Sequence, residues 1–208
     1  MRKVLGLIAA LLALAAVVAV GLGAYKLADP FAAQRQQQEQ KNLIKVWGTR
    51  ADPVQPAHHA PECTWPRPAN GQPFALMHIP ALWGRGQFGV VEGTTLPELA
   101  TGPGHVIGTS MPGGKNFAVA AHDITAGNPF MHLKSLRKGD KVYVVDKTCR
   151  FTYEVTRNPR IVWWTNTSVL RGEHNHHLIT LITCTPVTLV FVPHRVIVQG
   201  ELVNVRSR

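Results

Sequence analysis

Short runs in which hydrophobic and polar residues alternate fill the chain from Phe74 onward, and glycine or proline turns separate them. Runs of this length, rich in β-branched and aromatic residues, predict β-strands. They cover residues 74–79, 88–93, 105–110, 116–122, 140–146, 149–156, 160–164, 178–184 and 195–205. Many short strands with regular turn signals are typical of a β-sandwich or a closed β-barrel. We therefore expect one mostly-β domain over residues 73–208, an ordinary length for a single domain.

One stretch of this region has helical rather than strand-like spacing. Asn128 can cap a helix, Pro129 suits its first turn, and Gly139 can end it. The apolar residues between these signals would form one buried stripe: Phe130, Leu133 and Leu136. We expect a short helix within residues 128–140.

The N-terminal part has a different pattern, because residues 4–24 contain no charge at all. As a helix they are long enough to cross a hydrocarbon core of about 30 Å. A cleaved signal peptide, the alternative, has an apolar region of only about 7–15 residues. We predict a cytoplasmic tail over residues 1–3, a transmembrane anchor over residues 4–25, and an extracytoplasmic linker over the proline-rich residues 26–72. The folded domain would lie outside the cytoplasm on either interpretation.

The net charge and the cysteine count limit the possible partners and the possible disulfides. The net charge of +10 suits an anionic lipid, a wall polymer or nucleic acid, but no nucleic-acid-binding motif occurs, so we expect no nucleic-acid partner. Three cysteines in an oxidising compartment leave one unpaired within the chain. One permitted pairing joins Cys63 to Cys149 and leaves Cys184 as the free thiol.

Cys184 is the last residue of a predicted strand, just before Thr185-Pro186, and proline cannot donate to a sheet ladder. The thiol would therefore lie at a strand end, although a buried apolar cysteine is the alternative. Arg195 begins the next predicted strand. An antiparallel pairing of the two strands would return its guanidinium to the same end, where it can stabilise an oxyanion. A surface arginine beside a turn is the other interpretation.

His122 also ends a predicted strand. It shares a strand face with Ala118 and Ala120, whose small side chains leave room for a substrate. A structural histidine is the alternative, since the chain has ten histidines and the pattern alone does not single this one out.

Several motifs in sequence order resemble the sortase family, the cysteine transpeptidases that join surface proteins to cell walls or pili. They are TLxTC at 180–184, an N-x-A-hydrophobic-A-small run ending in histidine at 116–122, GPGHxxGTxxPG at 102–113, F-x-x-L-x-x-L-x-x-G-D at 130–140, and Ile79-Pro80. The resemblance covers residues 74–205 and implies a closed eight-stranded β-barrel with short helices. It also implies that Cys184 is the nucleophile, His122 the acid–base and Arg195 the electrostatic residue, and we expect Thr183, Ala120 and Ala126 to contact substrate.

The function that this resemblance implies is cleavage of an LPxTG- or LAxTG-like sorting signal between Thr and Gly. The protein would then be transferred through a thioester to an amine acceptor of the cell wall or a pilin. Asp123 stands where the family usually has arginine, and Ala126 stands where class E has a tyrosine, whereas the ending from Cys184 to Arg195 is similar to class C. A degenerate membrane-anchored binding or assembly module, or a thiol peptidase that releases substrate to water, are the alternatives.

The sequence gives little support for a zinc or a calcium site. The histidines of residues 173–177 have no Cys or His partners at zinc-ligand spacing. The loop of residues 157–177 has a single acid, Glu173, where calcium-binding sortases cluster several carboxylates. We expect no metal and no other cofactor. Trp163 and Trp164 either line a peptide groove or pack on the barrel, and packing is the favoured interpretation.

Overall fold

In the computed structural model, the described residues are 38, 41–42, 63, 67–172, 175–185 and 192–207. The predicted anchor and nearly all of the predicted linker lie outside these residues. Within the part of the chain that the structure describes, no helix is both long and apolar enough to cross a bilayer.

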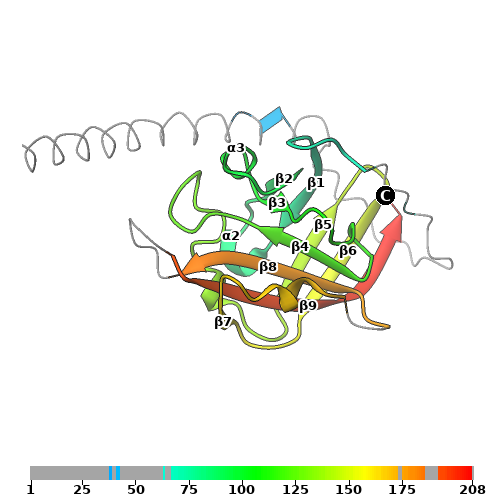
Figure 1. Cartoon of the computed structure of the whole chain (residues 1–208). Helices are drawn as coiled ribbons and strands as arrows, with labels where there is room; N and C mark the ends of the chain where they lie inside the picture. The colour runs from blue at the N-terminus through cyan, green and yellow to red at the C-terminus, as the bar shows by residue number, and fades with distance from the viewer. Residues whose placement is uncertain are drawn as a thin grey trace, which may run out of the picture.

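Eight strands form a closed barrel, as predicted. The described residues contain nine strands: β1 (Pro73–His78), β2 (Phe88–Glu92), β3 (Gly104–His105), β4 (Asn116–Ala120), β5 (Lys141–Val145), β6 (Cys149–Val155), β7 (Arg160–Trp163), β8 (Leu178–Thr185) and β9 (His194–Ser207). The sheet order is β6-β5-β1-β2-β3-β4-β8-β9, and a pairing of β6 with β9 closes it. β7 is a ninth strand that pairs with the first half of β9. Figure 1 shows β8 and β9 side by side along one wall of the barrel.

The helices are short: α2 (Pro80–Trp83), α3 (Leu96–Leu99) and the 3-10 turns η1 (Leu133–Ser135) and η2 (Thr167–Leu170). The helix expected within residues 128–140 is therefore wrong except for the single turn of η1. Asn128 has a φ of 54°, a left-handed conformation that is not the extended one of an N-cap. The predicted stripe is nevertheless buried, since Phe130, Leu133 and Leu136 are at most 1% exposed.

The strand expected over residues 105–110 is also mostly wrong, because β3 ends at His105. The chain turns instead at Gly108, whose φ of 90° is accessible to glycine. The Thr109 N–H closes this turn by donating to the Val106 carbonyl at 3.1 Å.

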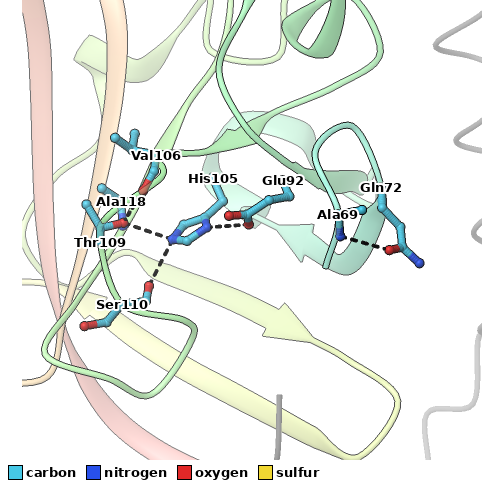
Figure 2. A network of polar contacts seen from close by, with 8 residues as sticks. All are labelled: Ala69, Gln72, Glu92, His105, Val106, Thr109, Ser110 and Ala118. Atoms are coloured by element: carbon cyan, nitrogen blue, oxygen red, sulfur yellow. Dashed lines mark hydrogen bonds and ion pairs between the residues drawn. The ribbon is translucent and has the colours of Figure 1, made fainter. Parts of the chain in front are cut away.

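A buried polar network fastens this turn to the barrel (Figure 2). His105 is fully buried, and its Nδ1 lies 2.7 Å from Oε2 of the equally buried Glu92. Its Nε2 lies 3.1 Å from the Ser110 carbonyl oxygen and 2.9 Å from Thr109 Oγ1, which in turn accepts from the Ala118 N–H of β4. Each ring nitrogen of His105 thus has a hydrogen-bond partner inside the barrel. The network joins β2, β3 and β4.

The barrel interior is aliphatic and aromatic, with one buried phenol. Tyr153 is fully buried in the core, and its hydroxyl oxygen accepts from the Gly113 N–H at 2.7 Å. Burial raises the pKa of Tyr153 well above its usual value, so this phenol stays neutral.

A disulfide joins Cys63 to Cys149, with their Cα atoms 5.9 Å apart. This is the pairing that left Cys184 free, and Cys184 is a free, half-buried cysteine in the structure. The disulfide attaches the segment before the barrel to the start of β6. Cys149 pairs with Ser207 at the end of β9, whereas Cys184 pairs with Arg195 at its start. The disulfide and the free thiol therefore lie at opposite ends of β9.

Candidate active site

Strand register brings the predicted nucleophile and the predicted arginine together. β8 and β9 are antiparallel, and Cys184 lies directly opposite Arg195. Directly paired residues project from the same face of a sheet, with Cβ atoms about 5 Å apart. The prediction that an antiparallel pairing returns Arg195 to the end of the sheet that holds the thiol is confirmed.

The third predicted residue is brought in by the strand on the other side of β8. β4 runs parallel to β8, and its last residue, Ala120, pairs with Ile182. Two further bonds extend the pairing: the Ala121 N–H donates to the Ile182 carbonyl at 3.1 Å, and Thr183 Oγ1 donates to the Ala121 carbonyl at 2.8 Å. His122 lies two residues beyond the end of β4, and extending this register by one more residue would bring it beside Cys184. We call this expected row of His122, Cys184 and Arg195 the catalytic row.

The loop after His122 is tightly turned. The His122 carbonyl accepts from the Phe130 N–H at 3.1 Å, which closes residues 123–129 into a compact loop. Ala126, Gly127 and Asn128 have consecutive positive φ values of 52°, 80° and 54°. The return of this loop onto His122 fixes where β4 ends and so fixes the backbone of the predicted acid–base residue.

Arg195 is held by its own backbone surroundings. Its Nη1 donates to the carbonyl oxygens of Val192 at 2.8 Å and His194 at 2.9 Å. A guanidinium has five N–H donors in a planar fork, so these two bonds orient the group and leave Nε and Nη2 as further donors. Val162 of β7 pairs with Arg195 on its other side, which makes β7 the flank of the row.

A chain of polar side chains lies under the catalytic row on the same face of the sheet. Arg160 Nη2 donates to Gln199 Oε1 at 2.7 Å, and Gln199 Nε2 donates to Thr180 Oγ1 at 3.3 Å. The buried Thr180 hydroxyl donates to Asn116 Oδ1 at 2.9 Å. Asn116 Nδ2 then donates to the Val169 carbonyl at 3.1 Å, which fastens η2 over the sheet. The sequence did not predict these hydrogen bonds between side chains. The one local sign of them is a polar residue, Gln199, within an otherwise hydrophobic strand.

Asp123, the residue after His122, has basic side chains near it. Burial raises the pKa of the Asp123 carboxyl, while the positive charges of Lys134 and His132 oppose that rise. Lys134 is itself fixed, because its Nζ donates to Thr185 Oγ1 at 2.6 Å. Asp123 is thus a partly shielded carboxylate next to two basic side chains.

The residues expected to contact substrate have different surroundings. Ala120 lies at the end of β4 on the face that carries Cys184. Thr183 is 3% exposed, and its hydroxyl joins β8 to β4 through Ala121. Ala126 is 5% exposed within the tight loop. Their contacts with substrate remain predictions.

Within the part of the chain that the structure describes, no group of three or more His, Cys, Asp or Glu residues is arranged to hold a metal ion. Two of the histidines considered for zinc have other partners: His176 Nδ1 lies 2.7 Å from Glu201 Oε1, and His177 Nδ1 lies 2.7 Å from the Gly113 carbonyl. Residues 173 and 174 lie outside the described residues.

Comparison with known proteins decides the family. The model of the sortase domain family matches residues 77–203, which is more than half of the chain. The chain belongs to the sortase family. This match spans β4, β8 and most of β9, so it includes all three residues of the row.

The domain is similar to class E sortases of Streptomyces, one of the two subclasses that the sequence suggested. Sortase SrtE1 of Streptomyces coelicolor is 32% identical over 155 residues, which cover 66% of this chain but only 42% of that protein. The structure of sortase E from Streptomyces avermitilis is 35% identical with a TM-score of 0.61, covering 67% of this chain and 93% of that one. Sortase E1 from S. coelicolor, solved with a tripeptide in its active site, is 32% identical with a TM-score of 0.59, covering 67% and 94%.

Proposed function

We propose that this sortase is a membrane-anchored cysteine transpeptidase that cleaves an LPxTG- or LAxTG-like sorting signal between Thr and Gly. The observation that supports the proposal is the strand register that pairs Cys184 with Arg195 and that, extended past the end of β4, brings His122 to the same end of the barrel. Of the three cysteines, only Cys184 is not part of a disulfide, so its thiol is available as a nucleophile.

In the first half of the reaction, the Cys184 thiolate attacks the carbonyl carbon of the scissile threonine. The oxyanion that forms lies within reach of the Arg195 guanidinium, whose fixed fork stabilises it without reorganisation. Collapse of this intermediate breaks the Thr–Gly bond. The departing glycine amine takes a proton from the His122 imidazolium, and a thioester on Cys184 remains.

In the second half, an acceptor amine attacks the thioester. His122, now neutral, accepts the proton that the amine loses, and the Cys184 thiolate leaves. The result is a new amide bond and the starting enzyme. Water in place of the amine gives a free carboxylate instead, so exclusion of water from the thioester decides between transfer and hydrolysis.

The substrate class follows from similarity. The related S. coelicolor sortase was solved with a tripeptide in its active site, which supports a peptide substrate here. We infer that the donors are surface proteins or pilins with a sorting signal, and that the acceptor is an amine of the cell wall or a pilin lysine. The uncharged residues 4–24 would anchor the chain as a single-pass protein with its barrel outside the cell membrane.

The test is product analysis by mass spectrometry of LPxTG and LAxTG peptides incubated with the full chain, with and without an amine acceptor. We expect a ligated product whose formation requires the acceptor and is abolished in Cys184→Ala. A hydrolysed product alone, even at saturating acceptor, would identify a peptidase. Peptide binding without any product would identify a degenerate binding module, in which Asp123 beside His122 marks the lost activity.

A further inference from the structure

A cavity lies on the back of the catalytic sheet. It has a volume of about 470 Å³, and its floor is made by Leu136 and Val196, both 1% exposed. Val196 pairs with Ile161 of β7, and both line this cavity. Because side chains alternate along a strand, Val196 and Ile161 project from the face opposite to Arg195. The cavity and the catalytic row therefore lie on the two faces of the same β7–β9 ladder.

The lining of the cavity is basic. Lys134 and Arg137 contribute two cations, Ser135 and Asn158 contribute neutral polar groups, and none of the described lining residues is acidic. Two carboxylates lie near these cations outside the lining: Asp140 accepts a hydrogen bond from the Arg137 N–H at 2.8 Å, and Asp123 interacts with Lys134. Lys134 is held in place by Thr185. The cavity is thus suited to an anionic group.

On β7, the lining residue Ile161 is followed two positions later by Trp163, which is not itself a lining residue of the cavity. Ile161 and Trp163 lie on one face of this strand and are 58% and 59% exposed. Trp163 packs against the His194 ring at a centroid distance of 4.5 Å, so its indole is supported on one side and open on the other. We call Ile161, Trp163, Lys134 and Arg137 the basic–aromatic rim.

We propose that the basic–aromatic rim docks on an anionic phospholipid surface, with a lipid phosphate group in the cavity between Lys134 and Arg137. Charge complementarity favours an anionic partner. The exposed aliphatic and aromatic side chains favour a lipid over a soluble polyanion, because tryptophan is stabilised at the boundary between headgroups and acyl chains. A soluble polyanion gains nothing from a half-exposed isoleucine and tryptophan.

Such docking leaves the catalytic row accessible. The rim occupies one face of the β7–β9 ladder, and Cys184 and Arg195 project from the other face. A barrel that rests on the membrane through the rim would present its row away from the lipid at a fixed height. This inference does not depend on the transpeptidase activity, since it concerns only the surface behind the site.

The test is hydrogen–deuterium exchange of the full chain with nanodiscs of phosphatidylcholine alone and with nanodiscs that also contain phosphatidylglycerol. We expect residues 132–138 and 157–165 to exchange more slowly only with phosphatidylglycerol. Each cation near an anionic leaflet contributes about five-fold to partitioning, so Arg137→Gln should weaken this protection about five-fold. Trp163→Ser should weaken it as well. The matched controls Arg150→Gln and Val203→Ser remove an exposed cation and an exposed apolar side chain elsewhere and should leave it unchanged.

Equal exchange in both kinds of nanodisc would overturn the proposal. So would equal protection by soluble polyphosphate with Trp163→Ser unaffected, which would identify a polyanion site instead. Protection that grows with the number of chains per disc would identify self-association and would overturn the proposal too.

Discussion

Loss of the Cys63–Cys149 disulfide should destabilise the barrel strongly and leave catalysis almost unchanged. The two cysteines are 86 residues apart in the sequence. The chain-entropy relation for cross-links of this loop length gives a contribution of about 4.6 kcal/mol at 25 °C. For a domain of this size, that loss corresponds to a fall in Tm of about 15 °C. Activity should persist below the new Tm because the disulfide and the catalytic row lie at opposite ends of β9.

The assay compares thermal unfolding and peptide cleavage of the native chain and Cys63→Ala. This variant keeps Cys149, which packs in the core as a small buried side chain. Cys184→Ala is the matched control, since it removes a cysteine that no disulfide uses, and its Tm should stay close to that of the native chain. A Tm for Cys63→Ala within about 2 °C of the native value would refute the assigned stabilisation. A collapse of kcat at a temperature where the variant is still folded would refute the separation of the two ends.

Three further predictions concern the row and its neighbours. Arg195→Lys should lose most activity, about 100-fold in kcat/KM, because a lysine cannot reproduce the planar fork; near-native kcat/KM would remove its assigned role. Thr183→Val should lower the free energy of unfolding by about 1–2 kcal/mol through loss of the hydrogen bond to the Ala121 carbonyl. Thr183→Ser keeps the hydroxyl and should recover most of that stability. Equal denaturation midpoints for the two variants would contradict the role of this hydrogen bond. Asp123→Asn should stabilise the fold at neutral pH but not below about pH 3.8. Burial raises the pKa of Asp123, so ionisation of this carboxyl costs free energy in the folded state. That cost is absent at acidic pH because the carboxyl is protonated in both the folded and the unfolded state. Urea titrations at acidic and neutral pH test this sign, and a gain confined to acidic pH would contradict it.

Most strands, and the pairing that brings Cys184 and Arg195 together, were accessible from the sequence because they depend on local patterns and a short connection. The alternation in residues 178–184 and 195–205 predicts two strands, and the short connection between them favours an antiparallel pairing with Cys184 and Arg195 at one end. Local pattern did not single out His122 among the ten histidines; its assignment came from the motifs that resemble sortases, and β4 ends two residues before it. Cysteine arithmetic permitted the Cys63–Cys149 disulfide but could not establish it, because the separation of the two residues in space is not a local property of the sequence.

The features that the sequence did not reveal depend on contacts between distant residues or on backbone conformation. Asn128 has the composition of a helix cap, but its left-handed φ belongs to the loop that folds back on His122. The polar chain from Arg160 to Asn116 joins residues of four strands, and no local pattern shows which polar side chains will meet. The cavity behind β7 likewise exists only because η1 lies under the first half of β9.

The most direct test of the central claim is mass spectrometry of the chain after acid quench of its reaction with a sorting-signal peptide. We predict an acyl adduct with the mass of the peptide up to threonine, linked as a thioester to Cys184. In His122→Ala the adduct should form far more slowly, because no imidazolium protonates the departing amine. An adduct on any other residue, or product formation by Cys184→Ala, would contradict the account.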